Sequence, residues 1–155
     1  MLIRHLTELG ITQWLPVFSE YSVPKPDIKK INSKMQRWDA IAKEAVKQCR
    51  RTRIPEILSP VTVQQAVEEN FGADLKIIFY ENETESLAKT MLSIKEKPSN
   101  IIALLGPEGG FSNKEVELAK SNGFIIASLG PRILRAETAS LSACTIIQHL
   151  FGDMC

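Results

Sequence analysis

Apolar and polar residues alternate along the chain in blocks that predict strands and helices in turn. Apolar runs at Lys76–Tyr80, Ile101–Leu105 and Phe124–Ala127 are typical of strands buried inside a parallel sheet. We place helices between and after them, at residues 84–93, at 112–123 and from Glu137 to Phe151. This alternation predicts an α/β fold with a mostly parallel sheet and helices on both of its faces.

The first part of the chain shows a short apolar run and then an amphipathic helix. Trp14–Phe18 is apolar, and a loop with two prolines follows it, through which a strand does not easily continue. From Ser33 to Arg50, apolar side chains recur at every third or fourth position. This spacing predicts a helix with one apolar face, and the other face carries most of the lysines.

Two pairs of residues have the spacing of a capping box. In this motif, the side chains of the residue at the start of a helix and of the residue three positions later each accept a hydrogen bond from the other's backbone nitrogen. Thr62 and Gln65 predict a short helix that extends to Phe71. Ser112 and Glu115 predict the start of a second helix. We expect each helix to stop at the next glycine along the chain.

Composition limits the class of protein. The chain has 155 residues, of which 44% are hydrophobic and 24% are charged, as is usual for one globular domain. No apolar run has the length of a membrane span, and no secretory signal pattern opens the chain, so we expect a cytoplasmic protein. Three cysteines without a CxxC pair and two isolated histidines indicate neither a disulfide framework nor a metal site.

Charge is distributed unevenly. Up to Arg53 there are eleven basic and five acidic residues, a net charge of +6, and the rest of the chain carries −5. Most of the positive excess lies between Lys25 and Arg53. An RNA-facing surface requires such a basic region, although a solvated helix face explains the charge pattern equally well.

The segment GPEGGFS, from Gly106 to Ser112, follows directly after a predicted strand. Ligands in open α/β sheets bind beyond the carboxyl ends of strands, and three glycines allow the backbone to turn sharply and approach a ligand closely. The segment has neither the lysine of a phosphate-binding loop nor the GxGxxG spacing of a dinucleotide site. Glu108 repels phosphate but suits a ligand with a sulfonium or an amino group. A glycine-rich turn with a purely structural role is the alternative.

A second loop, LGPRILRAET, runs from Leu129 to Thr138 and also contains a Gly-Pro pair. It presents Arg132, Arg135 and Glu137 within six residues. The arginines are suited to RNA phosphates or to a base carbonyl, and Glu137 is suited to the positive end of the last helix. A salt bridge that fixes the loop would account for Arg135 without any catalytic role.

These two loops carry a resemblance to a known family. GPEGGFS, followed by LGPRILRAET and the apolar segment ASLSACTIIQHL, resembles the paired signature of the RsmE family of ribosomal RNA methyltransferases. TELGITQWLPVFSEYSV and RWDAIAKEAVKQCRRTRIPEI are also similar to segments of that family. The resemblance runs from Thr7 to about Phe151.

The resemblance implies a SPOUT-type domain in which the C-terminal segment forms a trefoil knot, an exception to the rule that protein chains are not knotted. It also implies that S-adenosylmethionine binds in the knotted loops and that the protein is a homodimer with its site near the subunit interface. The residues that it assigns to the cofactor are Leu105, Gly106, Glu108, Gly109, Gly110, Leu129, Gly130, Ile133, Leu134 and Ala139.

By the same resemblance, the reaction methylates N3 of a uridine in small-subunit (16S) ribosomal RNA. The expected catalytic residues are Arg135, which would stabilise negative charge on the uracil oxygens, and Glu137, which would orient the base or accept its proton; Glu108 is a further candidate for that second role. The residues expected to contact RNA are Arg37, Lys47, Arg50, Arg51, Arg53 and Arg132.

The sequence departs from the family at its start. Residues 1–155 correspond to the methyltransferase domain alone, so we expect the N-terminal PUA-like RNA-binding domain to be absent. The strand that precedes the first helix in the family is expected to be missing or reduced to MLIR, which would expose one edge of the sheet.

Three hypotheses about function follow. The first is an active RNA methyltransferase. The second is a truncated, non-catalytic module that keeps the fold for RNA binding or dimerisation. The third is an enzyme that acts on nucleotide phosphates, which the missing loop lysine disfavours.

Overall fold

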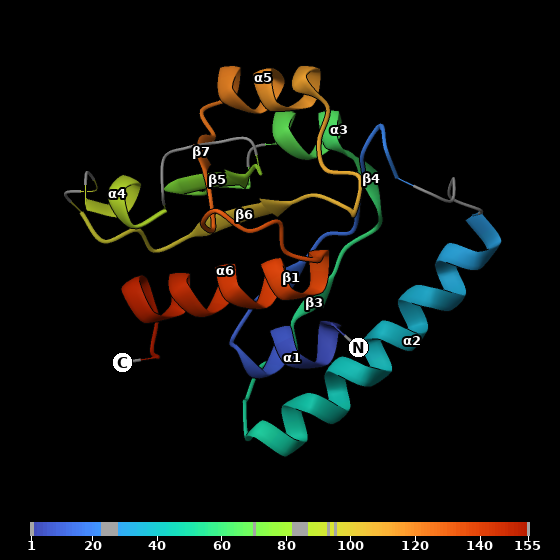
Figure 1. Cartoon of the computed structure of the whole chain (residues 1–155). Coiled ribbons are helices and arrows are strands. Elements are labelled where there is room, and N and C mark those ends of the chain that lie inside the picture. The colour runs from blue at the N-terminus through green and yellow to red at the C-terminus, as the bar shows by residue number, and fades with distance from the viewer. Residues whose placement is uncertain are drawn as a thin grey trace.

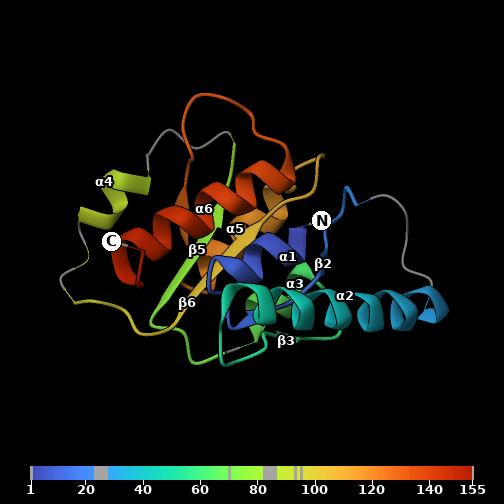
Figure 2. The same ribbon diagram turned by 90° about the horizontal axis from the view of Figure 1, so that it is seen from below.

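The computed structural model describes residues 2–22, 28–69, 71–81, 87–92, 94 and 96–154 (Figures 1 and 2). Its helices are α1 (Leu2–Glu8), α2 (Ile28–Cys49), α3 (Val63–Glu68), α4 (Leu87–Leu92), α5 (Asn113–Ser121) and α6 (Ala136–Phe151). Its strands are β1 (Gln13–Trp14), β2 (Val17–Phe18), β3 (Glu56–Ile57), β4 (Val61–Thr62), β5 (Leu75–Phe79), β6 (Ile101–Leu105) and β7 (Ile125–Ala127).

The largest sheet among these residues is parallel, with β5 in the centre between β6 and β7. Ile77 of β5 lies opposite Ala103 of β6 and Ile125 of β7. Because all three strands run in one direction, their carboxyl ends meet at the same edge of the sheet. The predicted parallel α/β architecture is confirmed.

Helices cover both faces of this sheet, and side chains of β5 point alternately to each (Figure 1). Ile78 packs in a core formed with α3 and α5. Ile77 and Phe79 pack in a second core formed with α4 and α6. The predicted coverage of both faces is therefore confirmed.

Two small parallel pairs lie beside the main sheet. β1 pairs with β3, and β2 pairs with β4. The apolar run Trp14–Phe18, which we expected as one element, is divided between β1 and β2 at Leu15 and Pro16. The carbonyl oxygen of Pro16 accepts a hydrogen bond of 3.1 Å from the backbone nitrogen of Val61, so the interruption still contributes to pairing.

The long helix α2 lies on the outside of the molecule and packs against α1 (Figures 1 and 2). The ring of Trp38 meets that of Trp14 edge to face, with centroids 4.7 Å apart. The helix begins five residues before the predicted Ser33, because Ile28 and Ile31 continue the three- and four-residue apolar spacing.

The first residues of the chain form a helix, not the remnant of a strand. α1 contains Leu2, Ile3 and Arg4, and the side chain of Ile3 is fully buried. Among the described strands, β6 and β7 form the two edges of the three-stranded sheet, and Ala103 in the middle of β6 is exposed.

Both predicted capping boxes are present. The backbone nitrogen of Thr62 donates to Gln65 over 3.0 Å, and that of Ser112 donates to Glu115 over 2.8 Å. α3 nevertheless ends at Glu68 and not at Phe71. Of the predicted helix at 84–93, the part that the structure describes is α4; residues 84–86 and 93 lie outside the described residues.

Candidate functional site

A pocket of about 90 Å³ lies where the carboxyl ends of β5, β6 and β7 meet. It is open to solvent and brings together both glycine-containing loops, which are more than fifteen residues apart in sequence. Its lining consists of Phe79, Tyr80, Glu81, Leu105, Gly106, Pro107, Glu108, Gly110, Ser128, Leu129, Gly130, Arg132, Ile133, Leu134, Ala136 and Ala139.

The first loop is held in a tight turn. The backbone nitrogen of Gly110 donates a hydrogen bond of 2.9 Å to the carbonyl oxygen of Pro107. Gly110 has a φ of +69°, in the left-handed region that side chains rarely adopt, so this position favours glycine. The hydroxyl of Ser19 donates to the carbonyl oxygen of Gly110 over 3.5 Å, which ties the loop to the segment after β2.

The second loop begins with a local turn of its own. The hydroxyl of Ser128 accepts a bond of 3.2 Å from the backbone nitrogen of Gly130 and donates one of 3.2 Å to its carbonyl oxygen. Gly130 has a φ of +115°, and a Cβ added there would meet no atom within 4 Å. The loop therefore leaves open space beside its glycine.

Among the described residues, three with charged side chains line the pocket. Glu81 and Glu108 bring carboxylates, and Arg132 brings a guanidinium; all three residues are exposed. Two negative groups against one positive group suit a ligand that itself carries positive charge.

Nine of the ten residues predicted to bind a cofactor line this one pocket. The exception is Gly109, where an added Cβ would lie 2.9 Å from the Cβ of Tyr21, so this glycine allows the segment after β2 to approach the loop. Sequence reasoning missed the segment Phe79–Glu81 and Ser128. Both follow the ends of strands, so the rule that pointed to the two loops would also have found them.

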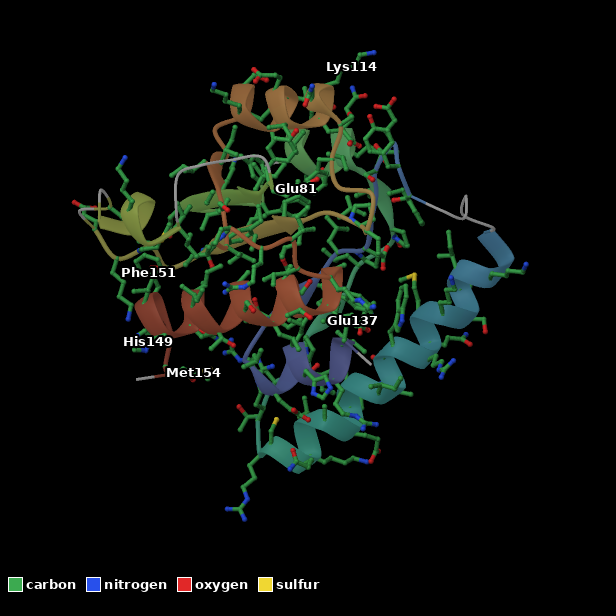
Figure 3. The ribbon with its side chains drawn as sticks, in the orientation of Figure 1. Glu81, Lys114, Glu137, His149, Phe151 and Met154 are labelled. Atoms are coloured by element: carbon green, nitrogen blue, oxygen red, sulfur yellow. The ribbon has the colours of Figure 1, made fainter. Side chains whose placement is uncertain are left out.

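The predicted catalytic residues lie at the rim of the pocket. Arg135 is the N-cap residue of α6. Glu137, which Figure 3 labels, lies in the first turn of that helix. Neither lines the pocket, but Ala136 between them does. Both side chains are exposed, so they are available to a substrate that covers the opening.

The predicted RNA-contacting residues occupy different settings. Arg37, Lys47, Arg50 and Arg53 are exposed on α2 or just after it, and Lys47 pairs with Glu44 over 2.8 Å. The hydrogen bond from Lys47, together with its positive charge, lowers the pKa of the Glu44 carboxyl. Arg51 instead donates to backbone carbonyls at the end of α1, and Arg132 lines the pocket.

A larger cavity, of about 510 Å³, lies between the segment after β2 and the first residues of α3 and α5. Its polar lining includes Thr62 and Ser112, whose side chains already serve as helix caps. It contains no residue of the second loop, and Figure 3 shows Lys114 of its lining apart from Glu81 and Glu137. We therefore place the candidate site in the smaller pocket.

The part of the chain that the structure describes lacks a membrane-spanning helix and a metal-binding cluster. No helix in this part of the chain is long and apolar enough to cross a membrane. No group of three or more His, Cys, Asp or Glu residues in it is placed to hold a metal ion.

Comparison with known proteins decides the family. Residues 1–148 match the family model described as "RNA methyltransferase domain". The chain belongs to this family. Among curated relatives, ribosomal RNA small subunit methyltransferase E of Buchnera aphidicola is 38% identical over 97% of this chain, and that of Bacillus subtilis is 35% identical over 96%.

Solved structures agree with the membership in this methyltransferase family. A methyltransferase of Legionella pneumophila, in complex with its bound cofactor SAM, matches 95% of this chain with 35% identity and a TM-score of 0.87. Ribosomal RNA small subunit methyltransferase E of Neisseria gonorrhoeae, bound to S-adenosyl methionine, matches 99% with 32% identity and a TM-score of 0.85.

The matches cover only part of each relative. The chain spans 58% of the Buchnera protein and 59% of both the Bacillus protein and the Legionella chain, and 61% of the Neisseria chain.

Proposed function

We propose that this chain binds S-adenosylmethionine in the pocket between the two loops and transfers its methyl group to N3 of a uridine in small-subunit ribosomal RNA. One observation carries the proposal: nine residues assigned to the cofactor from sequence line one pocket at the carboxyl ends of three parallel strands. The Legionella and Neisseria proteins, which are 35% and 32% identical to this chain, have solved structures with this cofactor bound.

The pocket residues fit such a ligand. Gly106, Gly110 and Gly130 keep the walls free of side chains; a Cβ at Gly110 would meet the carboxylate of Glu81. Leu105, Leu129 and Leu134 offer apolar surface for a flat base. The two carboxylates favour a cationic ligand over a phosphate.

In this reaction the protein aligns the methyl donor with the uridine base and helps to remove a proton from N3. It forms no covalent bond to the substrate itself. When bound, the cofactor supplies an electrophilic methyl group and keeps the bonding electron pair on its sulfur as that group leaves. Glu137 accepts the proton of N3, with Glu108 as the alternative acceptor, and the nitrogen lone pair then forms the new N–C bond. Arg135 stabilises the negative charge that develops on the uracil oxygens.

The RNA substrate is proposed to lie across the basic surface formed by Arg37, Lys47, Arg50 and Arg53 and to reach the pocket beside Arg132. Their charges attract the phosphate backbone, so binding should weaken as salt rises. Arg51 is left out of this surface because its guanidinium bonds backbone carbonyls of the protein.

A homodimer is proposed as the assembly. Ile133 is 86% exposed beside the pocket, and Ile146, Leu150 and Met154, on or just after α6, are between 36% and 43% exposed. Figure 3 shows Met154 and His149 near the end of this helix. Large apolar side chains that a monomer leaves in water are suited to burial against a second copy.

The trefoil knot and a location in the cytoplasm, where ribosomal RNA is modified, are part of the same proposal. The alternative is a non-catalytic module that keeps the fold for RNA binding or dimerisation.

Transfer of radiolabelled methyl groups from S-adenosylmethionine to small ribosomal subunits that lack the modification tests the proposal. Incorporation at a uridine, located by mass spectrometry of RNA fragments, is the expected result. The variant Arg135→Ala should lower the transfer rate by about 100-fold or more while binding the cofactor normally. Cofactor binding without any incorporation would select the non-catalytic module.

A further inference from the structure

We propose that Glu81 recognises positive charge on the methyl donor and thereby makes the pocket selective for a cationic ligand. The inference rests on the proposed function, because it concerns how the same pocket chooses its ligand. Glu81 is not among the residues that the sequence pointed to.

The fold holds Glu81 at the centre of the pocket wall. It stands two residues after Phe79, the last residue of the central strand β5, and thus between the loops that follow β6 and β7. The preceding residue, Tyr80, is anchored on both sides. Its backbone nitrogen donates to the carbonyl oxygen of Ala127 over 3.0 Å, and its hydroxyl donates to Asn113 over 2.9 Å.

The carboxylate of Glu81 lies over the glycine turn of the first loop. A Cβ built on Gly110 would be 3.2 Å from Oε2 of Glu81 and 3.1 Å from its Cδ. Figure 3 shows this side chain at the carboxyl end of β5. A ligand held by the amides of this loop therefore passes close to the carboxylate.

No described residue of the chain forms an ion pair with Glu81 or donates a hydrogen bond to its carboxylate. Glu108 adds a second negative group to the same lining, and Arg132 is the positively charged residue among the described lining residues. A carboxylate to which no described residue supplies a partner, at the wall of a pocket, gains from a cation that binds there.

Two centres of S-adenosylmethionine carry positive charge: the sulfonium and the α-ammonium group. The product S-adenosylhomocysteine keeps only the ammonium group, and 5′-methylthioadenosine has neither while it retains the adenosine. These three ligands separate the possible contacts, because a hydrogen bond from Glu81 to the ribose would be common to all of them.

The experiment is calorimetric titration of the full chain and of its Glu81→Gln variant with each ligand. We expect Glu81→Gln to weaken the affinity for S-adenosylmethionine about tenfold or more, as loss of a charge-assisted hydrogen bond predicts. The affinity for 5′-methylthioadenosine should change by less than about twofold. An equal loss for S-adenosylhomocysteine assigns the contact to the ammonium group; no loss for it assigns the contact to the sulfonium. Either result supports the proposal.

Glu117→Gln, an exposed glutamate on α5 outside the pocket, is the matched control and should change none of the three affinities. Glu81→Asp keeps the charge and should retain part of the selectivity. Equal losses for all three ligands, or no loss for any, would overturn the role of Glu81. If the folded, unchanged chain fails to bind S-adenosylmethionine at all, the proposed function itself fails, which is a separate outcome.

Discussion

The guanidinium of Arg51 donates a hydrogen bond of 2.7 Å to the carbonyl oxygen of Thr7, which joins the end of α2 to the end of α1. The same group donates to Ile11 over 2.9 Å and to Gly10 over 3.3 Å. The carbonyl oxygen of Thr7 also accepts a bond of 3.1 Å from the backbone nitrogen of Gly10, and Gly10 and Ile11 follow α1, so Arg51 fixes the turn in which α1 ends. Gln148 of α6 donates to Leu9 over 2.7 Å in the same turn, which connects this junction to the helix that begins at the pocket.

Arg51→Ala should therefore lower the free energy of unfolding by about 2–3 kcal/mol, because several charge-assisted hydrogen bonds are lost together. Urea denaturation measures this change. Arg53→Ala, at an exposed arginine two residues later, should change it by less than about 0.5 kcal/mol. Full stability of Arg51→Ala together with weakened RNA binding would contradict the structural role.

Arg50 adopts a φ of +59°, the left-handed conformation in which glycine usually ends a helix. The bond of 3.2 Å from the backbone nitrogen of Arg51 to the carbonyl oxygen of Val46 completes this type of helix end. Arg50→Gly should raise the free energy of unfolding by about 1 kcal/mol, since it removes the strain of a Cβ. A thermal melt compares it with Arg50→Ala, which keeps the strain and should show no gain.

The same pair of variants tests the proposed RNA surface. Both remove the charge of Arg50, so both should reduce the slope of RNA affinity against salt by about one counterion. Unchanged RNA affinity in both variants would take Arg50 out of that surface.

Local patterns in this chain were predictable and long-range contacts were not. The capping boxes of Thr62 and Ser112 depend on hydrogen bonds across three residues, so sequence spacing alone identified them. The pairing of β1 with β3 joins segments more than forty residues apart, and two-residue strands leave almost no periodic pattern. Glu81 could have been singled out because it follows a predicted strand, but the position of its carboxylate beside Gly110 exists only in the folded chain.

The role of Arg51 was also beyond the reach of sequence. In the sequence it is one of several basic residues near the end of an amphipathic helix, and charge alone does not separate it from Arg50 or Arg53. The guanidinium finds its carbonyl partners only because α1 packs beside the end of α2 in the folded chain. The candidate pocket, in contrast, was predictable, because glycine loops after parallel strands must converge at one edge of the sheet.

Gly110→Ala should impair the pocket more than the fold. Its left-handed φ of +69° makes any side chain costly by about 1–2 kcal/mol, and the added Cβ meets Glu81. Gly72→Ala is the matched control, because its φ is +64° and its Cβ would face open space. Both substitutions should lower the melting temperature. Only Gly110→Ala should also weaken the affinity for S-adenosylmethionine, by about tenfold. Equal affinities in the two variants would remove the first loop from the cofactor site.

Cys144 gives the chain a defined response to alkaline pH. Burial raises the pKa of its thiol to about 11, an effect that the nearby Arg51 partly offsets. In the unfolded chain this thiol ionises first, near pH 9, so the folded state loses stability relative to the unfolded state as pH rises from about 9 to about 11. In the Cys144→Ala variant, the free energy of unfolding should not show this part of the decline with pH. Urea denaturation at pH 8, 9.5 and 10.5 measures it in both proteins. Parallel curves for the two proteins would show that the thiol ionises alike in both states.

The most direct test of the central claim is calorimetric titration of the folded chain with S-adenosylmethionine, with ATP as the control ligand. We predict binding of S-adenosylmethionine at one site per chain and no binding of ATP, because the described lining of the pocket offers two carboxylates and no lysine that could bind phosphate. A folded chain that binds ATP, or that binds neither ligand, would contradict a methyltransferase site between the two loops.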